Sequence, residues 1–175
     1  MKLFISPHND DETLFGAFTL LREKPQVLIV YDSHTQLLRG DTITAEQRRQ
    51  ESRAAANILG VDVSFGGVSD TSSDYAECVA ALQPFIAAKH VWAPAFEPDG
   101  NAQHNLIANA VTSLFPAARR YMTYTRFGKS RGKLVPIAPG WTQKKLHALA
   151  CYETQLDLEA TRSFFLRDLY EYYLL

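Results

Sequence analysis

Short apolar runs alternate with longer segments of helical periodicity through most of this 175-residue chain. The clearest run, residues 27–31 (Val-Leu-Ile-Val-Tyr), is apolar and mostly β-branched, which is typical of a strand buried on both faces of a parallel sheet. Parallel neighbours need a long connection between them, usually a helix. Further strands are expected at residues 2–6, 61–65, 90–93 and 120–125. The alternation therefore predicts a mainly parallel sheet with crossover helices.

The helical segments carry start and stop signals of their own. Thr44 followed by Gln47 is a capping-box signature, and Gly60 is placed to end that helix. Pro84 is expected to kink or split the run 75–89. Other helices are expected at residues 13–22, 106–115, 141–152 and 159–173. The predicted fold is of the α/β class, a Rossmann-like three-layer α/β/α sandwich formed by a single domain over residues 1–175.

Charge and cysteine content exclude several classes of protein. The net charge is -1 and no long basic run is present, so nucleic acid is not expected as a partner. Lys144-Lys145, one of the densest basic spots, is expected to lie at a solvated helix or strand end. Cys78 and Cys151 are too few for a disulfide framework, and no stretch approaches the roughly 20 apolar residues of a membrane span. We expect a cytoplasmic protein without a membrane span.

The first strand-to-helix turn has an unusual density of ionisable groups. Residues 6–12 (Ser-Pro-His-Asn-Asp-Asp-Glu) place one histidine beside three carboxylates. Crowded carboxylates repel one another, so they need either a metal ion or solvent that screens the repulsion. His8 and Asp11 are spaced so that both can reach one ion at about 2.0–2.2 Å. The alternative is an acidic helix N-terminus that only complements the helix dipole.

A second histidine favours the metal. His104 lies just inside the helix that follows the fourth predicted strand, and open α/β sheets bind ligands at the carboxyl ends of their strands. Three loops are expected to converge there: residues 7–12, 32–40 and 94–104. A His-Asp-His set with open positions occurs at hydrolytic zinc sites and at non-haem iron(II) sites. His8, Asp11 and His104 are therefore the predicted ligands, with zinc, iron(II) or another divalent ion as the metal.

Four motifs resemble those of the LmbE/PIG-L metal-dependent deacetylases. Residues 7–12 are similar to that family's Pro-His-Pro-Asp-Asp-Glu signature, and residues 48–61 match its Arg-x-x-Glu-x-x-x-Ala-x-x-x-Leu-Gly-Val helix in register. His104 falls at the last histidine of its His-x-Asp-His or His-x-Asn-His motif. Residues 145–155 resemble its Lys-x-x-Ala-Leu…Ser-Gln stretch. The likeness spans residues 2 to 155, and the first motif is the specific one.

The resemblance implies a reaction, the hydrolysis of an N-acetyl amide on an N-acetylglucosamine unit or a related small molecule. It also implies that the three predicted ligands hold zinc and that Asp10 is the general base for the attacking water. Arg48 would face the substrate, with Arg49 as the alternative if the helix register is off by one. Glu12 is expected to be a structural carboxylate behind the ligands.

Two departures from the family pattern bear on catalysis. Asn101 stands where the family has the first histidine of its motif, and asparagine donates a hydrogen bond but no proton at pH 7. Gln103 replaces the motif's acid and can still accept the N–H of a ligand imidazole, without charge. An alternative function follows, a metal-retaining protein that binds a sugar-like ligand with weak or no hydrolase activity.

Two further segments leave alternatives open. His34, in the loop after the second strand, is either a substrate contact or a solvent-exposed side chain. The aromatic-rich tail, residues 164–173, is expected to pack on the core, with a homo-oligomer seam along this aromatic C-terminal helix, or a wall of the pocket, as the alternatives. Residues 126–140, which carry glycines and prolines, are expected to form a loop or hairpin.

Overall fold

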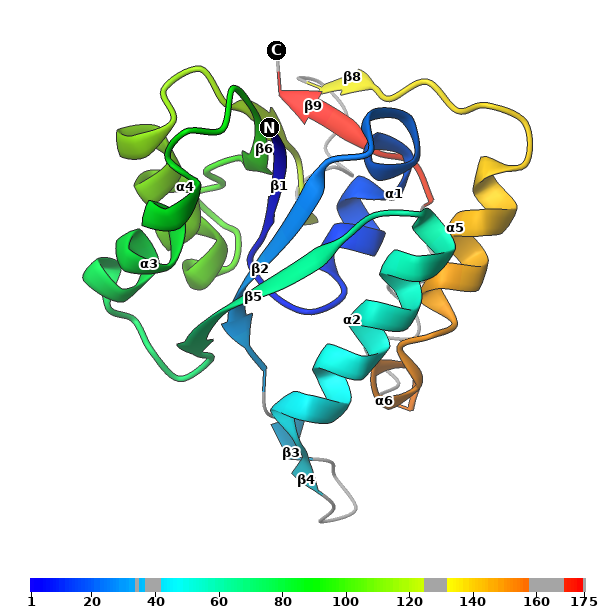
Figure 1. Ribbon diagram of the computed structural model, residues 1–175, viewed down its shortest axis with the longest axis horizontal. Helices are drawn as coiled ribbons and strands as arrows, with labels where there is room; N and C mark the ends of the chain where they lie inside the picture. The colour runs from blue at the N-terminus through cyan, green and yellow to red at the C-terminus, as the bar shows by residue number, and fades with distance from the viewer. Residues whose placement is uncertain (34, 37–41, 125–131, 158–168, 175) are drawn as a thin grey trace.

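A computed structural model of the chain describes residues 1–33, 35–36, 42–124, 132–157 and 169–174 (Figure 1). Its centre is a seven-stranded sheet in the order β5-β2-β1-β6-β7-β9-β8. The first five strands in that order pair in parallel, whereas the last two pair antiparallel. The strands are β1 Lys2–Ser6, β2 Gln26–Asp32, β5 Val63–Ser69, β6 His90–Pro94, β7 Arg119–Tyr121, β8 Gly132–Leu134 and β9 Tyr172–Leu174. A separate antiparallel pair joins β3 Thr35–Gln36 to β4 Thr42–Ile43.

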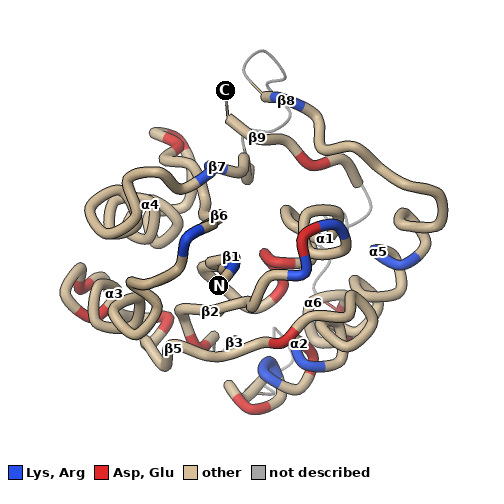
Figure 2. Tube along the Cα trace, turned by 45° about the horizontal axis from the view of Figure 1, so that its top comes forward, with Lys and Arg blue, Asp and Glu red and all other residues tan. Residues whose placement is uncertain are grey.

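Helices cover both faces of the sheet, as Figures 1 and 2 show from two directions. On one face lie α1 Asp11–Glu23, α2 Ala45–Leu59 and α5 Trp141–Leu149, followed by the short α6 Glu153–Leu156. On the other lie α3 Tyr75–Leu82 and α4 Ala102–Leu114. Each face has its own cluster of buried side chains, one around Phe18 and Trp92 and one around Leu28 and Val111. The predicted α/β/α sandwich with a mainly parallel sheet is confirmed.

None of the helices in the described ranges combines the length and the apolar character that crossing a bilayer requires.

The local helix signals act as the sequence predicts. The Thr44 hydroxyl accepts the Gln47 backbone N–H at 3.2 Å, and the Gln47 side chain accepts the Thr44 N–H at 2.8 Å, which completes the capping box of α2. Gly60 ends that helix in the left-handed region, with φ 68°, where glycine has no Cβ penalty. Pro84 lies in a 3₁₀ turn, Gln83–Phe85, that follows directly on α3. The predicted split of the 75–89 run is therefore confirmed.

The predicted helix over residues 159–173 is wrong at its C-terminal end. Tyr172–Leu174 forms β9, which lies in the sheet between β7 and β8. Tyrosine-rich runs suit the half-buried surface of a strand, and Tyr173 packs against the buried cluster around Phe18. Residues 158–168 lie outside the described ranges, so the proposed oligomer seam through this tail stays a prediction. Of the loop or hairpin expected at 126–140, residues 132–134 form β8, and residues 125–131 also lie outside.

The prediction that Lys145 is solvated is wrong, because only 1% of its surface is exposed. Its Nζ donates to the Leu14 carbonyl oxygen at 2.7 Å and to Glu171 Oε1 at 2.8 Å, and lies 4.8 Å from the centroid of the Phe18 ring. Glu171 is also buried, and its carboxylate accepts the Phe18 backbone N–H at 2.9 Å. This buried ion pair ties α5 and the segment entering β9 to the middle of α1.

Candidate metal centre

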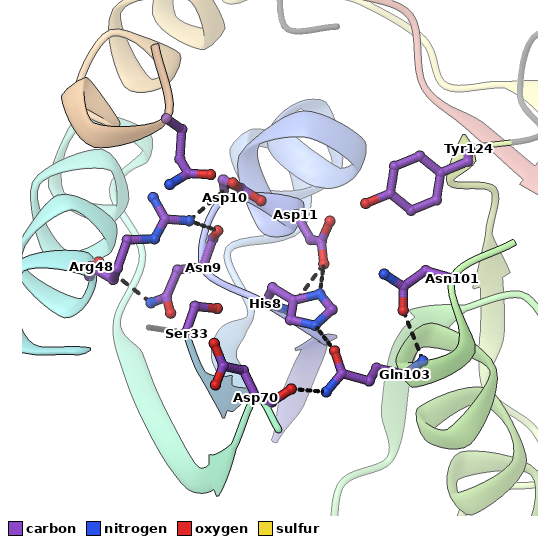
Figure 3. A pocket seen from close by; sticks show the side chains of 11 residues that line it. His8, Asn9, Asp10, Asp11, Ser33, Arg48, Asp70, Asn101, Gln103 and Tyr124 are labelled. Carbon is purple, nitrogen blue, oxygen red and sulfur yellow. Dashed lines mark hydrogen bonds and ion pairs between the residues drawn. The ribbon is translucent and has the colours of Figure 1, made fainter. Parts of the chain in front are cut away.

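The candidate site lies at the carboxyl end of the sheet, where the neighbouring strands β1 and β6 lead into α1 and α4. Residues 7–10 connect β1 to α1, and residues 95–101 connect β6 to α4. Both connections contribute to one open pocket, seen from close by in Figure 3. The pocket is lined by His8, Asn9, Asp10, Asp11, Ser33, Arg48, Asp70, Asn101, Gln103, Tyr124 and Gln155.

Three potential ligand atoms converge at this pocket, two from the lining residues His8 and Asp11 and one from the buried His104. His8 Nδ1 lies 3.2 Å from Asp11 Oδ2 and 3.2 Å from His104 Nε2, and His104 Nε2 lies 2.9 Å from Asp11 Oδ2. Ligands at about 2.1 Å around a tetrahedral ion are roughly 3.4 Å apart, so this triangle fits one metal ion with slight widening. Hydrogen bonds alone satisfy these three atoms poorly, because two imidazole nitrogens face each other as well as a single carboxylate. The donor set fits a divalent cation with further positions open.

The electrostatics of Asp11 also suit a ligand. Burial alone would raise the pKa of the Asp11 carboxyl, but the charge and hydrogen bonds of His104 and His8 hold that pKa well below its usual range. The carboxylate is therefore ionised, which is the form that coordinates a metal.

The orientation of His8 is set by Gln103 from the start of α4. The Gln103 amide nitrogen donates to the backbone carbonyl oxygens of Asp70, at 2.5 Å, and Ser72, at 3.3 Å. Gln103 Oε1 consequently faces His8 and lies 2.7 Å from His8 Nε2. The hydrogen of the neutral imidazole is then on Nε2, which leaves the lone pair of Nδ1 directed at the triangle. Gln103 thus selects the tautomer that binds a metal.

His104 is held differently. Its backbone N–H and that of Gln103 both donate to Asn101 Oδ1, which caps α4, at 3.3 and 2.8 Å. Its buried Nδ1 has no hydrogen-bond partner within the described part of the chain. Packing fixes the ring instead, with Tyr124 tilted against it at 5.2 Å and Phe15 edge-on at 6.4 Å between centroids. Because both Asn101 acceptor bonds use Oδ1, the Asn101 amide nitrogen points into the pocket (Figure 3).

Asp10 lies beside the ligands and is strained. As the N-cap of α1 it has φ 102°, a region that a side-chain-bearing residue enters only when its surroundings impose it. Arg48 Nη2 donates to Asp10 Oδ2 at 3.0 Å and to the Asn9 carbonyl oxygen, and Glu12 accepts the Asp10 N–H at 3.1 Å. Burial raises the pKa of the Asp10 carboxyl to about 7 against the opposing charge of Arg48. A neighbouring dication would favour the ionised form, which a general base requires.

Glu12 lies behind the ligand triangle. Its carboxylate is buried and accepts hydrogen bonds from the Tyr152 hydroxyl, from Ser6 Oγ at 3.3 Å and from the Asp10 N–H. Burial raises the pKa of Glu12 to about 8, although the Tyr152 hydrogen bond opposes that rise. Its contacts brace the turn that carries His8 and Asp10, and none of them is to the ligand atoms.

The structure places Arg48, and not Arg49, in the pocket lining. Arg48 is buried, and besides Asp10 it contacts Glu51 Oε2 at 2.8 Å and Thr154 Oγ1 at 3.3 Å. Arg49 instead pairs with Asp32, with its guanidinium 5.4 Å from the centroid of the Phe65 ring. A substrate contact for Arg48 stays a prediction; its clearest observed contact in the pocket is with Asp10.

Five pocket residues were given no role of their own by the sequence: Asn9, Ser33, Asp70, Tyr124 and Gln155. Asn9 and Ser33 lie in loops that the sequence placed at this crevice, and Gln155 ends the fourth family-like motif. Asp70 directly follows β5, so the rule that ligands bind at the carboxyl ends of strands was the signal that would have found it. Tyr124 follows β7 by three residues. His34, the predicted substrate contact, lies outside the described residues.

Replacing Gln103 with leucine is expected to weaken metal binding roughly 10–100-fold, the usual cost of removing a group that orients a ligand histidine. The leucine accepts no hydrogen bond from His8 Nε2, so both tautomers of His8 become populated. Competition with a chromophoric chelator measures the affinity.

The control is Gln143→Leu, on α5, where Gln143 lies 3.0 Å from His147 Nε2 away from the pocket. We expect wild-type affinity in this variant. Equal affinities in the Gln103 and Gln143 variants would show that Gln103 does not orient His8.

Solved structures similar to this chain share its fold at low sequence identity. A triple mutant of a deacetylase from the teicoplanin biosynthetic pathway is 15% identical, with a TM-score of 0.76 over 100% of this chain and 98% of that one. N,N'-diacetylchitobiose deacetylase from Pyrococcus horikoshii is 16% identical, with a TM-score of 0.74 over 98% and 81%. The hydratase GalB from Pseudomonas putida is 17% identical, with a TM-score of 0.70 over 99% and 95%. Because the fold also hosts a hydratase, activity has to be argued from the site.

The sequence comparison is more specific. Curated proteins gave no significant sequence match. A family model described as GlcNAc-PI de-N-acetylase, PIG-L, matches residues 3–115. That range includes His8, Asp10, Asp11 and His104, together with the whole of α2. The match covers most of the chain, and the chain therefore belongs to the PIG-L family.

Proposed function

We propose that this protein is a metal-dependent hydrolase that removes an N-acetyl group from an amino sugar or a related small metabolite. The observation that carries the proposal is the triangle of His8 Nδ1, Asp11 Oδ2 and His104 Nε2 at an open pocket that His8 and Asp11 line, with the carboxylate of Asp10 beside it. The family description and two deacetylases of the same fold support it.

The proposed metal is zinc, since two imidazoles and one carboxylate with an open position are typical of hydrolytic zinc sites. Iron(II) or another divalent ion is compatible with the same donors. When bound, such an ion acts as a Lewis acid that polarises the amide carbonyl and acidifies a water molecule.

Asp10 has the central role among the protein groups. Its carboxylate accepts a proton from the attacking water while the water oxygen bonds to the amide carbon. The same proton then passes from Asp10 to the departing nitrogen as the C–N bond breaks, which yields acetic acid and a free amine; the acid then loses its own proton to give acetate. Arg48 holds the Asp10 carboxylate in place through its 3.0 Å hydrogen bond. Asn101 can donate a hydrogen bond but cannot transfer a proton, so we assign both proton transfers to Asp10.

The pocket lining favours a polyhydroxylated substrate. Beyond the ligand triangle, Ser33, Asp70, Arg48 and Gln155 all present polar groups. The charges nearly cancel once a dication is present, because Asp10, Asp11 and Asp70 are offset by Arg48 and the metal. Such a lining recognises neutral hydroxyl groups by hydrogen bonding.

We also propose a cytoplasmic location, on the ground that Cys78 and Cys151 are both free thiols.

A second candidate function rests on Asn101. If the missing histidine is indispensable, the protein retains its metal and binds a sugar-like ligand without turning it over at a useful rate. The substitution itself is the observation that favours this alternative, because an amide at this position supplies no proton.

A screen for acetate release over N-acetylated amino sugars tests the proposal. The expected result is release of acetate from at least one of them, with loss of activity after chelation and recovery on adding zinc or iron(II). O-acetylated sugars serve as the matched control for unspecific ester hydrolysis. Metal-dependent binding of the sugars without acetate release would favour the second candidate and contradict the first.

A further inference from the structure

Tyr124 is a pocket residue to which neither the family motifs nor the proposed reaction gives a role. It lies just beyond β7, with its hydroxyl directed into the pocket from the side opposite Asp10 (Figure 3). Its ring is packed between the imidazole of His104, at 5.2 Å, and the ring of Phe15, at 5.5 Å with an interplanar angle of 75°. Its surface is 38% exposed, so a bound substrate can reach it.

The backbone next to Tyr124 is anchored by a buried carboxylate. Glu97 Oε1 accepts the Thr123 backbone N–H at 2.7 Å, and Glu97 Oε2 accepts the Thr123 hydroxyl at 3.1 Å. The loop that carries Glu97 is tied in turn to α4, because Asn105 Nδ2 donates to the Glu97 carbonyl oxygen at 2.7 Å. The backbone beside Tyr124 is therefore held, through Glu97 and Asn105, by α4, the helix that carries His104.

Amide hydrolysis needs hydrogen-bond donors on the side where Tyr124 lies. Attack on the carbonyl carbon places negative charge on the carbonyl oxygen, and donors aimed at that oxygen are usually a major source of rate enhancement. Asp10 and Arg48 occupy one side of the ligand triangle, and Asn101 and Tyr124 the other (Figure 3). Asn101 contributes a neutral amide N–H. A phenol contributes an O–H, and O–H···O⁻ bonds are among the shortest and strongest that proteins form.

We propose that Tyr124 is a catalytic residue that donates a hydrogen bond to the carbonyl oxygen of the bound amide and stabilises the negative charge that develops there. The phenolic proton stays on Tyr124 throughout, and the route of the transferred proton through Asp10 is unchanged. The proposal rests on the proposed hydrolase function, and it explains how a site with asparagine at position 101 can stabilise this charge.

The first test is Tyr124→Phe, which keeps the ring against His104 and Phe15 and removes only the hydroxyl. We expect kcat to fall roughly 10²–10³-fold, as for the loss of one oxyanion donor, with KM and metal content nearly unchanged. The matched control is Tyr75→Phe, because Tyr75 is a partly exposed tyrosine on α3 outside the pocket. Unchanged kcat in Tyr124→Phe, or a fall shared by Tyr75→Phe, would overturn the proposal.

A binding measurement separates this proposal from the proposed function. Acetate, the product, is titrated against the cobalt(II)-substituted protein, whose visible absorption reports ligands at the metal. We expect Tyr124→Phe to bind acetate roughly 10–100-fold more weakly than wild type, since a hydrogen bond to a charged acceptor is lost, and Tyr75→Phe to match wild type. This result without amide hydrolysis would overturn the proposed function and leave the donor role of Tyr124 standing. Equal acetate affinity in wild type and Tyr124→Phe, or no acetate binding at all, would overturn the role of Tyr124.

Discussion

Asp10→Asn is expected to lower kcat for acetate release roughly 10²–10⁴-fold, the range that a general base contributes, while the protein keeps its metal. Asparagine has nearly the same shape as aspartate. Its amide oxygen can still accept the hydrogen bond from Arg48 Nη2, which lies 3.0 Å from Asp10 Oδ2 in the wild type. It cannot accept a proton from water at neutral pH. Initial rates on the best substrate of the screen, together with metal analysis of the same preparation, measure both effects.

Asp74→Asn is the matched control for this variant. Asp74 is also the N-cap of a helix, α3, and its side chain accepts the Ala76 backbone N–H at 2.7 Å. Asparagine caps helices about as well as aspartate, so activity and stability should stay close to wild type. Full activity in Asp10→Asn would eliminate Asp10 as the base. Loss of metal together with activity would assign it a structural role.

Lys145→Met is expected to lower the free energy of unfolding by about 3–5 kcal/mol, because it leaves the buried carboxylate of Glu171 without its cation. Glu171→Gln should cost a similar amount for the converse reason. The double variant Lys145→Met with Glu171→Met should be less destabilised than the sum of the two single losses, since no uncompensated charge remains buried. Urea unfolding followed by circular dichroism, with the metal removed from every variant, measures these differences.

The exposed ion pair between Lys2 and Glu23 is the control for the buried one. Its N···O distance is 3.0 Å, similar to the 2.8 Å of the Lys145–Glu171 pair, but 43% of the Lys2 side chain is exposed. Such pairs contribute about 0–1 kcal/mol, so Lys2→Met should have a small effect. A loss in Lys145→Met no larger than that in Lys2→Met would contradict the structural role assigned to the buried pair.

Features encoded by neighbouring residues were predictable from the sequence. The capping box at Thr44 and Gln47, the stop at Gly60 and the split at Pro84 depend on contacts within a few residues, and the structure has all three. The parallel sheet followed from the alternation of elements. The rule that ligands bind at the carboxyl ends of strands grouped His8, Asp11 and His104. The structure brings their ligand atoms within 3.2 Å of one another.

Features that depend on distant contacts were missed. Lys145 follows another lysine on a helix that reads as solvated, and only the fold brings it to Leu14 and Glu171. Tyr172 and Tyr173 follow a segment of helical periodicity, but they form a strand that pairs with the edge of β7. Tyr124 lies in the pocket because β7 follows β6 in the sheet order. Local periodicity carries no information on such an order, which is why these roles had to come from the structure.

The central claim is that His8, Asp11 and His104 hold one catalytic divalent metal. Metal analysis of wild type and His104→Gln, both purified without added metal or chelator, tests it most directly. We predict roughly one divalent ion per chain in the wild type and a large loss of that ion in the folded His104→Gln variant, because a three-ligand site rarely retains its metal with two. A wild-type protein without a bound divalent ion, or a His104→Gln variant that keeps a full complement, would contradict the claim.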